Sequence, residues 1–265
     1  MKNIFSIFIL MSLLLNSFNS SAQKLKKQEV SYLSSDGVVC KSYVSYDKKI
    51  KGKRPVILVI PEWWGCNAYA KNRADMLASL GYIAIAVDMY GDGKQGIDPA
   101  QAGALATPFY QNPTMAMNRM EDAKKFISKY PQADAKNVSA IGYCFGGSMV
   151  LNAVGLGMDL NLGVSFHGGL GGLVAPQKGN KTKVLVCHGL ADKFITSEDV
   201  ESFRKNMDDS GINYSFVEYA DATHAFTNPD ATANGQKFGI PIAYNASADK
   251  KSWQDMLTFF ANIKK

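Results

Sequence analysis

The stretch GYCFGG, residues 142–147, places a cysteine where many enzymes carry the serine of a Gly-x-Ser-x-Gly turn. It lies between the apolar run NVSAI and the run SMVLNAV, a pattern that predicts a strand, a tight turn and a helix. Gly142 and Gly146 would let the backbone fold closely around Cys144. The thiol is therefore either a nucleophile on a strained turn or a structural side chain buried in it.

The helix that is predicted to begin near Gly147 favours the nucleophile. Its N-terminus points at Cys144, and its dipole favours a thiolate over a thiol. On the same turn, the backbone N–H of Phe145 is placed to bind an oxyanion. The turn could thus supply both a nucleophile and one donor for a tetrahedral intermediate.

A nucleophile of this kind needs a base, and the base needs an acid that orients it. Asp192 in HGLAD follows one predicted strand, and His224 in YADATHAF follows the next. The order Cys144, Asp192, His224 is the nucleophile–acid–histidine order of α/β-hydrolases. Taken singly, Asp192 could be a helix cap, and His167 and His188 also end predicted strands. Together, the three residues of the triad are expected to meet at the carboxyl edge of a sheet.

Strands and helices that could position these residues alternate along the chain after residue 22. The runs 29–35 and 38–46 alternate apolar and polar residues around Asp36-Gly37, which predicts a hairpin. Continuous apolar runs predict strands that are buried on both faces. The further strands are expected at 55–60, 82–87, 137–142, 162–167, 183–188 and 212–219. Helices are expected at 68–80, 99–107, 113–130, 148–154, 197–210 and 247–263.

This alternation predicts an α/β fold with a mostly parallel central sheet, helices on both faces and an N-terminal antiparallel hairpin. The sequence contains no internal repeat, low-complexity tract or linker. We therefore expect a single domain over residues 23–265.

The sequence resembles the dienelactone hydrolase family, the cysteine-dependent branch of the α/β-hydrolases. The resemblance covers nearly the whole chain after residue 22, and the cysteine turn followed by two glycines is its specific motif. The motifs that carry it are PVILVIPEWWG (55–65), VDMYG (87–91), IGYCFGG (141–147), HGLAD (188–192) and YADATHAF (219–226). The resemblance implies an α/β-hydrolase fold and the hydrolysis of a carboxylic ester or lactone.

Two more site residues follow from the resemblance. Glu62 in PEWWG matches a glutamate that contacts the catalytic cysteine of similar enzymes and helps to hold it until substrate arrives. A carboxylate beside a thiol would disfavour the free thiolate or take its proton. Alternatively, Glu62 is a solvated loop carboxylate. The backbone N–H of Trp63 would be the second oxyanion donor.

The implied chemistry is acyl transfer to a cysteine. The Cys144 thiolate would attack the carbonyl carbon, and the amides of Phe145 and Trp63 would bind the oxyanion. His224 would transfer the proton and then activate water, while Asp192 fixes its tautomer. No metal or organic cofactor is needed, and the partner is a small-molecule ester or lactone. The alternative is a non-catalytic binding or thiol-sensing protein that has retained the fold.

The substrate is where the sequence departs from the family. Members that act on dienelactone hold its carboxylate with basic residues, one in the helical stretch after VDMYG and one just after the catalytic histidine. Here neither 98–108 nor 225–235 contains lysine or arginine, so dienelactone itself is not predicted. An apolar or aromatic pocket is favoured instead, although its candidate residues could equally be packing residues. These are Trp63, Trp64, Tyr90, Phe109, Tyr110 and Phe226.

The first residues do not belong to the predicted domain. They comprise Lys2, an apolar stretch from Ile4 to Leu15, and small residues up to Ala22. Because the apolar stretch is too short to span a bilayer, a cleaved secretory signal peptide over residues 1–22 is favoured over a membrane anchor. We therefore expect an exported protein, periplasmic or secreted, that is not attached to a membrane.

The composition argues against several other classes of protein. The formal net charge of +6 comes from scattered lysines without interleaved aromatic residues, so a nucleic-acid groove is not predicted. The cysteines and histidines do not have the spacing of a zinc site. A chain of this size needs no disulfide to be stable, although a bridge between Cys40 and Cys66 stays open at this point.

Overall fold

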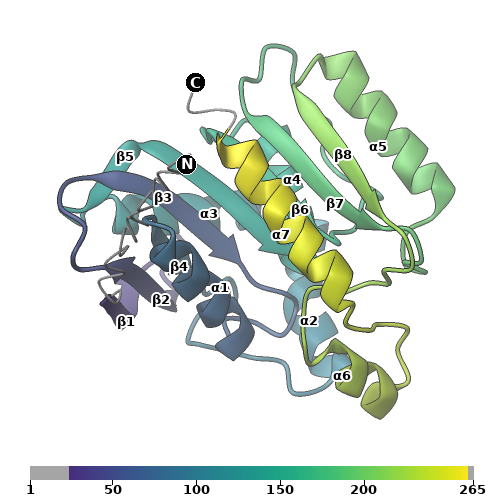
Figure 1. The fold of residues 1–265 in the computed structure, drawn as a ribbon, viewed down its shortest axis with the longest axis horizontal. Coiled ribbons are helices and arrows are strands. Elements are labelled where there is room, and N and C mark those ends of the chain that lie inside the picture. Colours follow the sequence, from purple (N-terminus) through teal and green to yellow (C-terminus); the bar gives the residue numbers. More distant parts are fainter. Residues whose placement is uncertain (1–23, 262–265) are drawn as a thin grey trace, which may run out of the picture.

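The computed structural model describes residues 24–261, which form an eight-stranded sheet with helices on both of its faces (Figure 1). The predicted signal peptide lies outside the described residues. The strands are β1 (Leu25–Leu33), β2 (Val39–Asp47), β3 (Arg54–Ile60), β4 (Ile83–Ala86), β5 (Ala133–Tyr143), β6 (Leu162–Phe166), β7 (Lys183–Gly189) and β8 (Tyr214–Tyr219). Their order across the sheet is β1-β2-β4-β3-β5-β6-β7-β8.

The pairing of the strands confirms the predicted fold class. β1 and β2 form the expected antiparallel hairpin, and β2 pairs antiparallel with β4. From β4 to β8, every neighbouring pair is parallel. A mostly parallel sheet that is entered through an antiparallel hairpin is the α/β-hydrolase architecture that the sequence indicated. Its parallel strands all end at the same edge, where loops can bring distant residues together.

The helices agree with the sequence prediction except at four places. They are α1 (Ala68–Ser79), α2 (Pro99–Gln111), α3 (Pro113–Ile127), α4 (Phe145–Gly155), α5 (Ser197–Ser210), α6 (Ala231–Phe238) and α7 (Ala246–Ala261). α2 continues through Pro108, beyond its predicted end. Pro108 has no N–H to donate to the carbonyl oxygen of Ala104, but Ala104 is exposed, so water can take the place of this hydrogen bond. α6 was not predicted, since its sequence ATANGQKF is short and contains a glycine. α4 begins at Phe145 rather than near Gly147, and α3 ends at Ile127 rather than at residue 130.

Two hydrophobic cores cover the two faces of the sheet. In β3, Val56, Leu58 and Ile60 face one core, whereas Ile57 and Val59 face the other. The first core is completed by residues of α2, α3, α4 and α5, and the second by residues of α1 and α7. Figure 1 shows α1 and α7 on the near face of the sheet. Burial on both faces explains why the central strands are continuous apolar runs rather than alternating ones.

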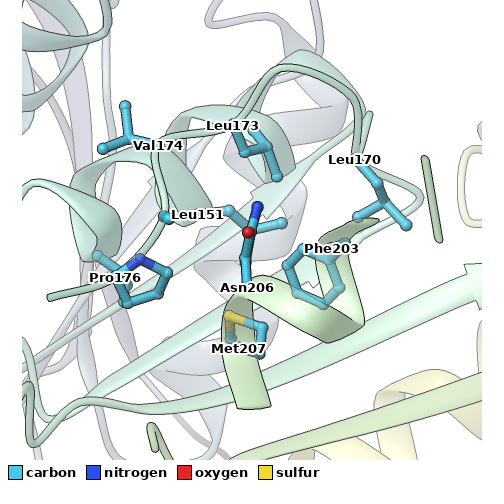
Figure 2. Close-up of a pocket in the computed structure, with 10 residues that line it drawn as sticks. Leu151, Leu170, Leu173, Val174, Pro176, Phe203, Asn206 and Met207 are labelled. Atoms are coloured by element: carbon cyan, nitrogen blue, oxygen red, sulfur yellow. The ribbon is translucent and has the colours of Figure 1, made fainter. Parts of the chain in front are cut away.

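A small cavity lies within the first core, between α4, the segment 170–176 and α5. Figure 2 shows the side chains of Leu151, Leu170 and Phe203 among those that converge on it. Its volume is about 20 Å³, which leaves room for about one water molecule. Its lining is apolar apart from Asn206, and it contains no titratable side chain. We refer to it as the α4–α5 cavity. Among residues 24–261, no helix is both long and apolar enough to cross a membrane.

Candidate active site

Cys144 occupies a sharp turn between the end of β5 and the start of α4. Its backbone angles, φ 51° and ψ −117°, lie in a region that residues with a Cβ rarely adopt. The flanking glycines make this turn possible, as the sequence predicted. A Cβ on Gly142 would lie 2.1 Å from the carbonyl oxygen of Gly146, and one on Gly146 would lie 2.2 Å from that of Ile60. The turn therefore lifts the thiol out of the sheet at its carboxyl edge.

Cys144, Asp192 and His224 meet in one continuous line. His224 Nε2 lies 2.9 Å from Cys144 Sγ, and His224 Nδ1 lies 2.8 Å from Asp192 Oδ2. Asp192 follows β7 and His224 follows β8, so the two loops come from neighbouring strands. The other oxygen of Asp192 accepts a hydrogen bond from the backbone N–H of Phe194 at 2.9 Å, which fixes the carboxylate. A thiol, an imidazole and a carboxylate joined in this order are the groups that nucleophilic catalysis by cysteine requires.

The surroundings of His224 favour its protonated form. Burial alone lowers the pKa of this imidazole, but the adjacent Cys144 sulfur and the Asp192 carboxylate together outweigh burial and hold the pKa well above its usual value. An imidazolium at this position can donate a hydrogen bond to the sulfur of Cys144. The N-terminus of α4 begins directly after Cys144, so the positive end of the helix also lies beside this residue.

Glu62 follows β3 and faces the same site, but its contact differs from the expected one. Its side chain is almost fully buried, so it is not a solvated loop carboxylate. Oε2 accepts a hydrogen bond from Asn228 Nδ2 at 2.6 Å, whereas the buried Oε1 has no partner. Among the described residues, no hydrogen bond joins Glu62 to Cys144, because the thiol is bonded to His224 instead. Burial raises the pKa of Glu62 to about 7, against the lowering effect of Asn228 and His224.

Two backbone amides beside the thiol are free to act as donors. Within the described residues, neither the N–H of Trp63 nor that of Phe145 donates to a protein acceptor. The backbone of Trp63 is held in place through its carbonyl oxygen, which accepts a hydrogen bond from the hydroxyl of Tyr90 at 2.9 Å. Unpaired amides at the start of a helix and beside a nucleophile suit an oxyanion.

The thiol opens onto a cavity of about 280 Å³, which we call the Cys144 cavity. Of the aromatic residues considered from the sequence, Trp63, Trp64 and Tyr110 line it. Tyr90, Phe109 and Phe226 do not, and their assignment to the pocket is corrected by the structure, which buries Phe109 in the first core. Tyr90 packs against Phe145 with ring centroids 5.6 Å apart, and Phe226 is fully buried in the second core. These two rings support the site from behind rather than from within the cavity.

The remaining walls of the Cys144 cavity come from segments that the sequence did not single out. Phe194 and Ile195 follow Asp192 directly, and Ile240 and Ile242 follow α6. α2 provides the opposite wall. The only indication of this in the sequence was that the predicted helix follows the VDMYG motif. Its residues in the lining are Gly103, Ala106, Thr107 and Tyr110. Glu62 and His224 are charged or titratable members of the lining, but it contains no lysine or arginine.

The other cysteines and histidines are not members of the line of three residues, although His167 adjoins it. Cys40, Cys66 and Cys187 are free and buried, so the bridge between Cys40 and Cys66 that the sequence left open does not form. Burial raises the pKa of both Cys66 and Cys187 to about 12, which keeps these thiols protonated. His188 packs against Phe216. His167 lies behind Cys144, against its backbone.

Comparisons with known proteins support the family resemblance. A model of the dienelactone hydrolase family matches residues 41–264. Protein usf of Aquifex pyrophilus is 28% identical over 204 residues, which cover 73% of this chain and 84% of that protein. A Salmonella typhimurium protein named "putative carboxymethylenebutenolidase" is 26% identical over 245 residues, covering 88% of this chain and 86% of the relative.

Solved structures show the same relationship. The dienelactone hydrolase-like promiscuous phosphotriesterase from metagenomic libraries superposes with a TM-score of 0.82 at 32% identity, covering 90% of this chain and 98% of its own. A Klebsiella pneumoniae protein named "putative dienelactone hydrolase" shares the fold, with a TM-score of 0.74 and 22% identity over 90% of this chain and 99% of its own. The chain belongs to the dienelactone hydrolase family and is, with that family, a carboxylic ester or lactone hydrolase.

Proposed function

We propose that this protein hydrolyses uncharged carboxylic esters or lactones through a thioester on Cys144. The observation that carries the proposal is the line of two short hydrogen bonds, Asp192 to His224 and His224 to Cys144, which ends at an apolar cavity. The free amides of Trp63 and Phe145 stand beside the thiol. Each component of a nucleophilic acyl transfer therefore has a candidate in the site.

In the first half of the reaction, the Cys144 thiolate attacks the carbonyl carbon and a carbon–sulfur bond forms. The carbonyl oxygen gains the negative charge, which the N–H groups of Phe145 and Trp63 stabilise. When the tetrahedral intermediate collapses, the bond between the carbonyl carbon and the ester oxygen breaks. The imidazolium of His224 gives its proton to the leaving oxygen, and an acyl thioester remains on Cys144.

In the second half, water replaces the alcohol. Neutral His224 removes a proton from the water as its oxygen attacks the thioester carbon, and Asp192 stabilises the resulting imidazolium and fixes its tautomer. Collapse then breaks the carbon–sulfur bond and releases the carboxylic acid. The thiolate and imidazolium pair with which the reaction began is thereby restored.

Glu62 has a separate role in the proposal. With a pKa of about 7 and a place in the lining of the Cys144 cavity, it can carry or release a proton at neutral pH without leaving the site. In the resting arrangement Asn228 holds it. We propose that Glu62 restrains Cys144 in a second arrangement of the thiol, in which Sγ turns from His224 towards the carboxyl group.

The proposal is tested with short p-nitrophenyl esters and the wild-type and Cys144→Ala proteins. Wild type should release p-nitrophenol with a burst, and mass spectrometry of the quenched protein should show the acyl group on Cys144. Cys144→Ala should lose both the burst and the turnover. Retained turnover in this variant would rule out the nucleophile and favour a different hydrolytic route.

A second measurement addresses Glu62. If the carboxyl group restrains the thiol, iodoacetamide should label Cys144 slowly in the wild-type protein and faster in Glu62→Ala. Cys66 and Cys187, which are buried and protonated, provide an internal background for the labelling. Equal labelling rates in the two proteins would exclude the restraining role.

A further inference from the structure

A second histidine lies directly behind the nucleophile and takes no part in the proposed proton transfers. The backbone N–H of Cys144 points at His167 Nδ1, 3.0 Å away, and shares its hydrogen bond with the carbonyl oxygen of Phe166, also at 3.0 Å. His167 is only 1% exposed and does not line the Cys144 cavity. It therefore contacts the nucleophile through the backbone alone and cannot reach a substrate.

The hydrogen bonds of His167 determine its tautomer. Because Nδ1 accepts a hydrogen bond from an N–H group, it carries no proton, and the proton must be on Nε2. Nε2 lies 2.7 Å from Thr227 Oγ1, to which it therefore donates, and Thr227 Oγ1 in turn lies 2.6 Å from the hydroxyl of Tyr69. The result is a buried line of hydrogen bonds from the backbone of Cys144 to α1.

His167 is held in the neutral state that this line requires. Burial lowers its pKa well below the usual value, and the neighbouring His224 and Arg73 lower it further. The rings of His167 and His224 are 5.5 Å apart, so a neutral His167 adds no repulsion when His224 becomes charged. The two histidines thus keep opposite protonation states side by side.

Both ends of the hydrogen bond between Cys144 and His167 are in strained backbone. Cys144 has a φ of 51° and His167 a φ of 42°, a backbone conformation that is unfavourable for a residue with a Cβ. Such conformations persist only where the surroundings over-determine them. The shared N–H of Cys144 supplies part of that constraint, because it fixes the peptide plane from which the side chain of Cys144 departs.

One short segment connects this support to the catalytic base. Residues 224–228 contain His224, which contacts Sγ, Thr227, which anchors His167, and Asn228, which holds Glu62. Arg73 anchors the segment by donating to the carbonyl oxygen of Thr227 at 2.6 Å. The position of the base and the position of the nucleophile are therefore set by the same five residues.

We propose that His167 is a positioning residue, which in its Nε2–H tautomer fixes the backbone of Cys144 so that Sγ faces His224. It acts through the Tyr143–Cys144 peptide and touches neither substrate nor Sγ. The inference rests on the proposed function, because it assigns to His167 the orientation of the proposed nucleophile. Thr227 and Tyr69 complete the support by fixing the ring of His167.

The experiment compares His167→Asn with His167→Leu. The amide oxygen of asparagine can take the place of Nδ1 and accept from Cys144, whereas leucine removes the acceptor and keeps an apolar side chain. Turnover of a p-nitrophenyl ester is divided by the folded fraction, which is measured by circular dichroism against the wild-type protein, so that misfolded protein does not count. We expect kcat to fall on the order of 10²-fold in His167→Leu, with KM unchanged, and His167→Asn to recover at least tenfold of that loss.

The alkylation rate of Cys144 provides a readout that does not depend on ester hydrolysis. A thiolate paired with His224 is alkylated well below the pH at which a free thiol reacts. In His167→Leu the pH profile of alkylation should move towards that of a free thiol, and in His167→Asn it should stay with the wild type. If His167 were merely structural, its replacement would lower the thermal midpoint and the folded fraction but would leave the pH profile of alkylation unchanged.

Thr227→Val and Thr227→Ser carry the test if His167→Leu does not fold. Valine removes the acceptor of the Nε2 proton, so it should lower kcat and shift the alkylation profile in the same direction, whereas serine should preserve both. Unchanged kcat and profile in His167→Leu, or in Thr227→Val, would overturn the inference. Turnover retained in Cys144→Ala would instead overturn the proposed function, and the alkylation profile would still decide the role of His167.

Discussion

Two cavities of very different character adjoin α4. The Cys144 cavity lies at its N-terminus and has a volume of about 280 Å³, whereas the α4–α5 cavity lies along its side, at Leu151 and Val154, and has a volume of about 20 Å³. Both are lined mostly by apolar side chains. Only the first contains titratable groups, namely Glu62, Tyr110, Cys144 and His224.

The difference between the cavities lies in how their walls are built. The α4–α5 cavity is bounded by α4, α5 and the segment 170–176, whose side chains converge on it (Figure 2). At the Cys144 cavity, α2 and the segment after α6 supply part of the walls, and the loops that follow β3, β7 and β8 supply the hydrogen-bonded polar side chains. An apolar hollow therefore becomes a candidate active site only where strand ends deliver partnered polar groups into it.

The largest effect is expected in the Cys144 cavity, from His224→Asn. The amide of asparagine can still donate to Asp192 in place of Nδ1, but no base remains beside Sγ. The ratio kcat/KM for a p-nitrophenyl ester should fall on the order of 10³-fold, while the free energy of unfolding should change by less than about 1 kcal/mol. A loss of less than tenfold would contradict the role of His224 as base.

Leu151→Ala should produce the opposite pattern in the α4–α5 cavity. Leu151 is 4% exposed, and its truncation enlarges a void that already exists. We expect the free energy of unfolding, measured with urea, to fall by about 3 kcal/mol. The kcat of the folded fraction should stay at the wild-type value. A tenfold loss of kcat in folded protein would show that the two cavities are coupled through α4.

The charge of Glu62 should give the Cys144 cavity a pH-dependent effect on stability. Its pKa is about 7 in the folded protein and 4.5 in its unperturbed state, so the folded protein retains a proton that the unfolded chain releases between these values. Stability from the protonated form is therefore complete below pH 4.5 and is lost as the pH rises to about 7. Glu62→Gln cannot ionise, so its free energy of unfolding should rise relative to that of wild type by about 3 kcal/mol from the lower to the upper end of this pH range.

Urea unfolding of both proteins between pH 4.5 and pH 8.5 measures this difference. Leu151→Ala serves as the matched control, because its loss of stability involves no titratable group and should be the same at every pH. If the free energies of unfolding of Glu62→Gln and wild type change with pH in parallel, Glu62 is ionised in the folded protein throughout. A group besides Asn228 must then stabilise its carboxylate.

The parts of the site that the sequence predicted are those with a local signal. Cys144, Asp192 and His224 each follow a recognisable strand, so their meeting point could be inferred from the order of the strands. His167 also ends a strand, but its role depends on a contact with a backbone N–H group 23 positions earlier, for which there is no pattern. Contacts of this kind are set by the twist and register of the sheet.

The walls of the Cys144 cavity were harder to predict for a related reason. Ile240 and Ile242 follow α6, a helix too short to show periodicity, and they reach the cavity only after the chain has turned back. Phe226 lies near His224 in the sequence yet points into the second core. An aromatic residue close to a motif can therefore face either the cavity or the core, and only packing decides between them.

The smallest effect concerns the charge of the substrate. p-Nitrophenyl butyrate and p-nitrophenyl hemisuccinate are similar in length, but the second brings a carboxylate into a cavity whose lining has no lysine or arginine and already holds Glu62. Because an unpaired buried carboxylate is costly, kcat/KM for the hemisuccinate should be lower by on the order of tenfold.

Thr107→Arg should reverse this preference. Thr107 lies on α2, is exposed and lines the Cys144 cavity, so an arginine there can reach the carboxylate without being buried. The hemisuccinate should gain relative to the butyrate by a few fold, as expected for a partly exposed ion pair. Thr107→Gln, of similar size but uncharged, should leave the ratio as it is in wild type. Equal rates for both esters in the wild-type protein would mean that acyl groups occupy the mouth of the cavity rather than its interior.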